Sequence, residues 1–309
     1  MITYYTSENG TLRESEELVH GCWVSVVEPN PQEIKTLIED FGLDSGFIKS
    51  SLDEEESSRI EREDDQTLII VDTPVSSVNE ENTSLFYTLP IGIIITGNFV
   101  FTISSKPTRI IDEAVKGGIR SLTPSFKTRF VLQLLLRIAT LFLLYLKQID
   151  KMSSAAEQQL HDAMKNELLI QLLALEKSLV YFSTSLKANE ATIEKIFRGR
   201  VLKLYDDDQD LLEDVLIEMK QAIEMASIYS GILSSMMDGF SSVISNNLNM
   251  VMWRLTTITI IMAIPTMVYS FYGMNTGGLP FAGTTWFPFM LSLVLTLFVA
   301  ILLLRKNKK

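Results

Sequence analysis

Two long apolar segments close the chain. Val251–Phe271 carries no charge after Arg254, and Trp286–Leu304 carries none at all. At about 1.5 Å of rise per residue, each segment is long enough to cross the roughly 30 Å hydrocarbon core of a bilayer as a helix. Each also has a tryptophan at or near its start, and aromatic rings favour the membrane interface. The pattern predicts two transmembrane helices, joined by an extracytoplasmic loop over 272–285.

A third apolar segment, Phe130–Leu146, has a different character. It contains Gln133 and Arg137 near its middle, and its helical pattern continues through charged residues beyond Leu146. An arginine at the centre of a membrane span costs about 2.5–3.5 kcal/mol on insertion scales. We therefore predict a buried helix of the soluble part here, rather than a third span.

The charges flanking the spans predict the orientation of the chain. Residues 305–309 form a basic cytoplasmic tail, Arg-Lys-Asn-Lys-Lys, which the positive-inside rule assigns to the cytoplasm. Two spans return the N-terminus to the same side, so some 250 residues are expected in the cytoplasm. We expect a multi-pass protein of the cell membrane with both termini inside, and the single cysteine, Cys22, fits that reducing compartment.

The periodicity before the membrane predicts an α+β protein with three cytoplasmic parts. Residues 1–118 are expected to form a cytoplasmic α/β domain. Its predicted elements are strands at Gly21–Val27, Leu68–Val71, Ser84–Leu89 and Ile91–Ser104, the last turning at Gly97-Asn98, and a helix at Pro31–Phe41. Residues 119–206 predict a helical hairpin, built from helices over 127–165 and 167–198. Residues 207–271 predict a stalk helix about 100 Å long that continues into the first span, because no helix breaker occurs before Pro265.

The segment Asp53–Asp65 is strongly acidic, with eight acidic residues against Arg59 and Arg62. Two interpretations stay open. It is either a solvated loop or helix edge, or a surface that senses cations.

A stripe of small and polar residues with spacing of three and four follows the stalk. Positions with this spacing share one face of a helix. Its members are Glu224, Ile228, Gly231, Ser235, Asp238, Ser242, Ser245, Asn249, Met252, Thr256, Thr259, Ala263, Thr266 and Ser270. The stripe enters the predicted membrane segment without losing phase.

Two hypotheses account for the stripe. Small residues are common where membrane helices pack, which explains Thr256 to Ser270. A dry seam would, however, bury Asp238 beside copies of itself at a high cost. A water-filled axis shared by several copies explains both halves, and it requires a symmetric oligomer because one helix cannot enclose a pore. Met252 and Leu255, near the membrane entrance, are suited to an apolar constriction that gates by dewetting.

Composition excludes several other functions. The formal net charge of −11 argues against a nucleic-acid partner, which would meet a basic face. A single cysteine excludes a multi-cysteine metal site, and the presence of only two histidines, His20 and His161, argues against a histidine-rich zinc site. No nucleophile–base pair or phosphate-binding glycine loop is visible, so we do not expect an enzyme.

The first span ends in Tyr272-Gly273-Met274-Asn275. The asparagine amide offers a neutral carbonyl oxygen and an NH₂ donor. A ring of such carbonyls can accept hydrogen bonds from the waters of a hydrated cation. That suits Mg²⁺, which dehydrates reluctantly and usually keeps several waters.

A Gly-Met-Asn tripeptide between two C-terminal spans, preceded by a long stalk and by the segment from Ser245 to Met252, resembles the CorA family of divalent-cation channels. The likeness covers nearly the whole chain. It implies a homopentameric funnel in the membrane lipid that conducts Mg²⁺, and often Co²⁺ or Ni²⁺, with closure by cytoplasmic Mg²⁺. By matching position it implies a selectivity ring of Gly273, Met274 and Asn275. It also implies a conduction path that includes Asp238, Asn249, Met252, Leu255 and Thr266.

The same resemblance implies a regulatory metal site that includes Asp214. Its partner acid aligns with Ser50 here, and Asp53 lies three residues further on. The outer loop, from Thr276 to Gly283, has no acid, whereas some members carry glutamate there. Two alternative functions stay open: a zinc transporter of the same superfamily, and a membrane-anchored cytoplasmic sensor or scaffold.

Overall fold

The computed structural model describes residues 1–8, 11–78, 84–120, 122–162, 166–199, 202, 205–275, 278, 280–281, 283–284 and 286–306. The chain forms two compact units, Met1–Met237 and Asp238–Lys309, and each is described by itself.

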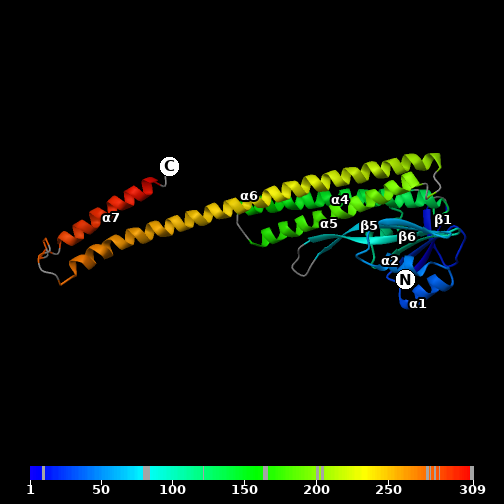
Figure 1. Cartoon of the computed structure of the whole chain (residues 1–309), viewed down its shortest axis with the longest axis horizontal. Coiled ribbons are helices and arrows are strands. Elements are labelled where there is room, and N and C mark those ends of the chain that lie inside the picture. The colour runs from blue at the N-terminus through cyan, green and yellow to red at the C-terminus, as the bar shows by residue number, and fades with distance from the viewer. Residues whose placement is uncertain are drawn as a thin grey trace. The chain divides into compact units, whose positions relative to one another are not determined.

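The first unit contains a seven-stranded sheet in the order β2-β1-β3-β7-β6-β5-β4. Strands β1, β5 and β6 of this sheet are labelled in Figure 1. The strands are β1 (Ile2–Glu8), β2 (Thr11–Ser15), β3 (Trp23–Val27), β4 (Arg59–Glu63), β5 (Gln66–Val78), β6 (Ser84–Ile95) and β7 (Val100–Ser104). Only β3 and β7 pair in parallel, and the other neighbours are antiparallel. The sheet is therefore mixed, with one crossover connection.

One face of the sheet is covered by α1 (Pro31–Glu39) and α2 (Ser45–Leu52). The core on this side combines strand residues Val24, Val26, Leu68 and Ile70 with helix residues Leu37, Phe47 and Ile48. Successive side chains of a strand point to opposite faces, so Trp23 lies on the other side of β3. The start of α1 is stabilised by a capping box, in which the Asn30 side chain accepts from the Glu33 backbone and the Glu33 side chain accepts in return.

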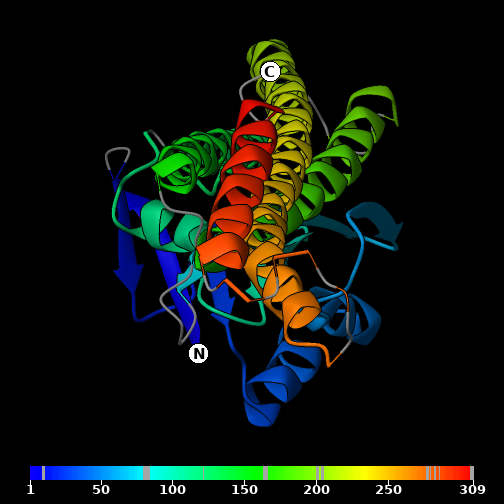
Figure 2. The ribbon, with the colours of Figure 1, turned by 90° about the vertical axis from the view of Figure 1, so that its left-hand side faces the viewer.

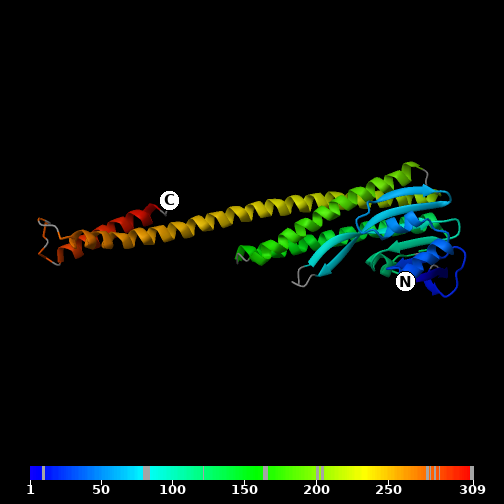
Figure 3. The ribbon, with the colours of Figure 1, turned by 60° about the horizontal axis from the view of Figure 1, so that its bottom comes forward.

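The other side of the sheet packs on α4 (Lys127–Asp162) and α5 (Asn166–Gly199), as Figure 3 shows. Aromatic rings carry much of this contact. Trp23 meets Phe130 of α4 at 5.4 Å between ring centroids, and Phe86 of β6 meets Phe182 of α5 at 6.3 Å. The long helices are thus fixed to the sheet by large buried side chains, with α3 (Arg109–Val115) leading into them.

The apolar segment at Phe130–Leu146 is part of α4 and is buried in the first unit, as the sequence predicts. Phe130, Leu135 and Phe142 have no exposed surface. Gln133 and Arg137 both have partners within the unit. Arg137 pairs with Glu113 at 2.6 Å, and the Gln133 amide donates to the Arg120 carbonyl oxygen. These contacts give the two side chains an ion pair and a hydrogen bond, which lipid tails could not provide.

The prediction of separate strands before and after Pro90 is wrong, because β6 runs through this residue. Pro90 pairs with Asp72 of β5. The Asp72 backbone exchanges both its hydrogen bonds, each of 2.9 Å, with the Asn189 side chain of α5 instead of with β6. Pro90 therefore occupies a pair position where its missing N–H removes no hydrogen bond between the two strands.

Several elements escaped the sequence patterns. The acidic segment Asp53–Asp65 contains β4, an edge strand, where a loop or helix edge was expected. Charged side chains are common on edge strands, since they discourage pairing with other chains. Strands β1 and β2 and helices α2 and α3 were also not predicted.

The second unit contains the last part of α6 (Asp206–Tyr272) and α7 (Trp286–Lys306). The predicted stalk helix over 207–271 and the predicted helix over Trp286–Leu304 therefore differ from α6 and α7 by at most two residues at each end. The first apolar segment, Val251–Phe271, is the last part of α6. Within this unit α7 runs back beside the end of α6 (Figures 1 and 2). Tyr272 and Phe287 hold the two helices together at the loop, with ring centroids 6.1 Å apart.

Candidate functional site

The stripe on α6 is solvent-exposed along its whole length in the single chain. All fourteen positions from Glu224 to Ser270 are exposed. The apolar members are no exception: Ile228 is 58% exposed and Met252 is 55% exposed. The pore residue expected beside the stripe, Leu255, is exposed at 59%. No element of the chain therefore covers this line of residues in the part that the structure describes.

In the first unit, α6 buries a different face. Leu212, Val215, Met219, Ala222 and Ala226 have no exposed surface. Their spacing of three and four residues places them on one face of the helix, away from Glu224, Ile228, Gly231 and Ser235. The packing of α6 in this unit thus leaves the stripe free.

In the second unit, α7 is the neighbour of α6. The less exposed positions of α6 there, including Trp253, Thr257 and Val268, again repeat every three to four residues. Thr257 is only 7% exposed, and Ser292 of α7 is 6% exposed. The stripe residues Thr259 and Thr266 are offset from this contact face by about half a turn. Among the described residues of this unit, the stripe therefore has no partner either.

The hydroxyl groups of the stripe are oriented by the helix backbone. Ser242 donates to the Asp238 carbonyl oxygen, Thr259 to that of Leu255 and Thr266 to that of Met262, at 2.8–3.1 Å. Because each hydroxyl hydrogen is used within the helix, the oxygen's lone pairs remain for an outside donor. A hydrated cation presents water hydrogens, which such acceptors can bind.

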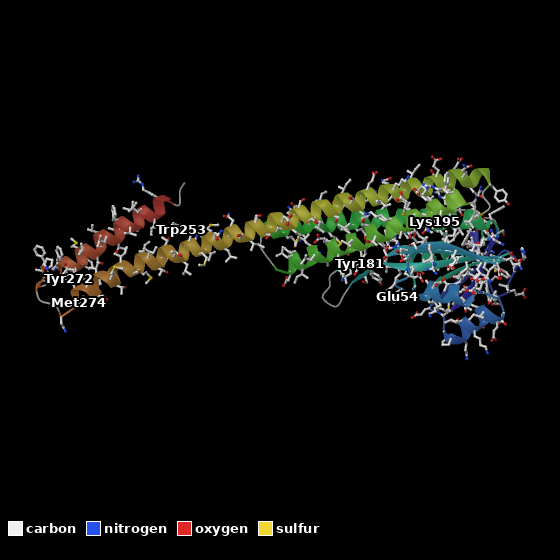
Figure 4. The ribbon with its side chains drawn as sticks, in the orientation of Figure 1. Glu54, Tyr181, Lys195, Trp253, Tyr272 and Met274 are labelled. Carbon is white, nitrogen blue, oxygen red and sulfur yellow. The ribbon has the colours of Figure 1, made fainter. Side chains whose placement is uncertain are left out.

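At the end of α6, Gly273 continues the helical bonding, donating to the Tyr269 carbonyl oxygen at 2.9 Å. A Cβ at Gly273 would lie 3.1 Å from that oxygen, so the backbone turns tightly here. Met274 is 52% exposed, and Figure 4 shows it at the tip of the second unit together with Tyr272. Asn275 is also exposed, and its amide has no hydrogen-bond partner among the described residues. Of the outer loop, 276, 277, 279 and 282 lie outside the described residues.

The expected regulatory residues are Asp214 and Asp53. Asp214 is exposed on α6, and Asp53 follows α2 and accepts a hydrogen bond from the Glu55 N–H at 3.0 Å. Ser50, at the position of the family's partner acid, instead accepts from the Arg59 guanidinium at 3.1 Å. The positive charge of the Arg59 guanidinium therefore lies beside Ser50, and it disfavours the binding of a metal ion there. The described residues of the single chain contain no group of three acidic, histidine or cysteine side chains placed to hold a metal.

The acidic segment borders a small polar cavity of about 210 Å³ between α5 and the sheet. Glu54, at its edge, pairs with Lys106 at 2.7 Å, and Glu56 pairs with Arg59. Burial raises the pKa of the Asp72 carboxyl in the cavity, and a hydrogen bond with Ser185 lowers it in part. Sequence reasoning missed Asp72, although a single acid after the apolar strand residues 68–71 was an available signal.

Three features define a membrane protein with a large soluble part. The first unit is folded, α6 and α7 each contain an apolar stretch long enough to span a bilayer, and the exposed stripe of α6 is followed by the exposed amide of Asn275. The chain belongs to the CorA family: the model of the CorA-like Mg²⁺ transporter protein matches residues 20–309.

Two curated relatives extend this result. The chain is 30% identical over 295 residues to the cobalt/magnesium transport protein CorA of Methanocaldococcus jannaschii, covering 91% of this chain and 87% of the relative. It is 21% identical over 277 residues to the magnesium transport protein CorA of Helicobacter pylori, covering 86% and 82%.

The fold agrees with a solved structure of the family. The complete structure of the CorA magnesium transporter from M. jannaschii matches with a TM-score of 0.81 and 25% identity, covering 100% of this chain and 98% of that one. The chain therefore has a CorA-like fold, with an N-terminal soluble domain and long helices.

Proposed function

We propose that this protein is a divalent-cation channel that conducts Mg²⁺ into the cytoplasm through a homopentameric pore, with Co²⁺ and Ni²⁺ as further permeant ions. Family membership and relatives that transport cobalt and magnesium support the ion class. The exposed stripe on α6 is the observation that carries the pore.

The exposure pattern favours a pore because polar side chains are exposed within an otherwise apolar segment. Thr259, Thr266 and Ser270 are exposed in the part of α6 that is long enough to span a bilayer. If these side chains faced lipid, their hydroxyl oxygens would find no water to donate hydrogen bonds to them. Facing copies of themselves around a symmetry axis, they line a hydrated path. The path continues through Asn249, Ser245, Ser242 and Asp238 toward the cytoplasm.

Gly273, Met274 and Asn275 form the outer mouth in this proposal. The Asn275 amide is free to bind water, and the described loop residues include no acid that could also bind the cation. A ring of neutral carbonyl oxygens suits a hydrated Mg²⁺, because it binds the ion's water without trapping the ion as a ring of carboxylates would. Met252 and Leu255 form the apolar gate at the other end of the span.

Closure by cytoplasmic Mg²⁺ is the proposed regulation. Asp214 supplies a carboxylate on the exposed part of α6. Asp53 is the candidate partner on a neighbouring copy, since Ser50 is held by Arg59.

The decisive test compares Mg²⁺ uptake by liposomes that contain the full chain or its Asn275→Ala variant. We expect uptake to fall at least tenfold in the variant, because the ring then lacks its carbonyl oxygens, while the oligomer stays intact on size-exclusion chromatography. Asn246→Ala is the matched control, an exposed asparagine of α6 outside the stripe, and should retain full uptake. Unchanged uptake by Asn275→Ala would refute the role given to the ring.

The same liposomes separate the alternatives when the ion is varied. Preferred Zn²⁺ flux, increased by a proton gradient, would favour the zinc transporter. Membranes that stay impermeable to every divalent ion would favour the anchored sensor or scaffold, for which a polar stripe has no evident use.

A further inference from the structure

Charge is divided sharply between the two ends of the sequence. Residues 239–309 contain five basic side chains and no acidic one, whereas the whole chain has a formal net charge of −11. Every Asp and Glu residue therefore precedes residue 239. Arg254 is the single charged residue between Asp238 and Arg305.

Arg254 and Arg305 lie at the same distance along their helices from the loop that joins α6 and α7. Tyr272 and Phe287 mark a common level, because their rings are in contact at 6.1 Å. Arg254 lies 18 residues before Tyr272 on α6, and Arg305 lies 18 residues after Phe287 on α7. At 1.5 Å per residue, both guanidinium-bearing positions are about 27 Å from that level, which is close to one hydrocarbon thickness.

Neither arginine has an acidic partner in the described part of the chain, and both are exposed. Among the described residues, the Arg254 guanidinium makes a single weak hydrogen bond, to the Met250 sulfur at 3.6 Å. Trp253, labelled in Figure 4, precedes Arg254 and is half-buried. An aromatic ring beside an arginine is a combination typical of the level where lipid headgroups lie.

We propose that Arg254 and Arg305 form a binding surface for anionic phospholipid headgroups in the cytoplasmic leaflet of the bilayer. The proposal rests on the membrane orientation given above, with the apolar segments in the bilayer. Because the second unit has no acid near this depth, a lipid phosphate supplies the countercharge for the two guanidinium groups. Arginine suits this ligand, since its planar donors match phosphate oxygens in pairs.

The test measures which lipid touches Trp253. The full chain carries three tryptophans, and Trp23 is fully buried in the first unit, where its indole N–H donates to the Thr102 hydroxyl oxygen at 2.8 Å. A Trp286→Phe variant therefore leaves Trp253 as the lipid-accessible fluorophore. It is reconstituted into vesicles of phosphatidylcholine mixed with phosphatidylglycerol, with one lipid or the other brominated to quench the fluorescence.

We expect phosphatidylglycerol to bind beside Trp253 about fivefold more strongly than phosphatidylcholine, the preference expected of one basic residue near an anionic surface. Salt at 1 M should reduce the preference. Arg254→Gln should bring the ratio close to one, and Arg254→Lys should retain most of it. Lys220→Gln, which removes an exposed basic residue of α6 from the first unit, should leave the ratio unchanged.

Equal quenching by the two lipids would overturn the proposal, as would an Arg254→Gln variant that keeps the preference. Inorganic phosphate added at constant ionic strength should not lower the ratio, and a loss of preference there would assign the site to free phosphate instead. No ion flux enters this measurement, so a failed lipid preference leaves the proposed channel untouched, and a failed channel leaves the lipid test valid.

Discussion

Helix α4 and helices α6 and α7 are alike in composition but differ in what covers them. Each contains an apolar stretch of membrane-spanning length. In α4, 67% of that stretch is buried within the protein, whereas in α6 and α7 the values are 11% and 6%. The apolar surface of α4 is thus satisfied by its own chain, while that of α6 and α7 must be covered from outside.

The polar residues inside each stretch explain the difference. In α4, Arg137 has Glu113 as its partner, and the sheet supplies Trp23 and Phe86 for the apolar faces. In α7, the apolar stretch carries no charge that would need a partner. Hydrophobicity and length alone do not tell a buried helix from a span, and the polar residues with their partners do.

The largest effect expected from this comparison concerns matched phenylalanines. Phe142 of α4 has no exposed surface, and its ring lies 5.1 Å from that of Phe182. Phe142→Ala should destabilise the first unit by about 3–5 kcal/mol through the cavity it leaves. The Phe298 side chain of α7 is 60% exposed, so Phe298→Ala should change the free energy of unfolding of the protein by less than about 1 kcal/mol.

Thermal unfolding of the full chain in detergent, followed by near-ultraviolet circular dichroism, measures both variants. The Phe142→Ala midpoint should fall by roughly 10 °C and that of Phe298→Ala by no more than a few degrees. Equal shifts would mean that α4 and α7 are not distinguished by their surroundings.

A smaller effect is expected on the exposed face of α6 in the first unit. Asp214→Ala removes the proposed regulatory carboxylate, so the cytoplasmic Mg²⁺ concentration that halves uptake should rise about fivefold or more. Asp210→Ala, one turn earlier and also exposed, is the control and should leave that concentration unchanged. Liposome uptake at graded internal Mg²⁺ measures both, and inhibition that does not change in Asp214→Ala would reject the site.

Much of the helical architecture followed from periodicity and charge. The stalk helix, the two apolar helices and the buried character of α4 were predictable, because long patterns without breakers leave few other structures. The stripe was also visible in the sequence, and the structure adds that no described residue of either unit covers it.

The sheet was predicted less well, because its edges depend on partners distant in the sequence. Strand β4 has no apolar alternation, and it exists through pairing with β5. Opposite Pro90, the Asp72 backbone of β5 is satisfied by the Asn189 side chain, which lies 117 residues away in the sequence. At the site, the hydrogen bonding of Arg59 to Ser50 could not be inferred from spacing.

The central claim is that the exposed stripe of α6 lines a water-filled path between copies of the chain. Single cysteines at Thr259, Thr266 and Met262 test it, in a Cys22→Ser background that removes the only native thiol. Met262 is 68% exposed in the single chain but lies outside the stripe. In liposomes free of cytoplasmic Mg²⁺, a water-soluble cationic thiol reagent should modify Thr259→Cys and Thr266→Cys and block Mg²⁺ uptake. It should leave Met262→Cys unmodified. Equal modification at all three positions, or none at the two stripe positions, would contradict the account.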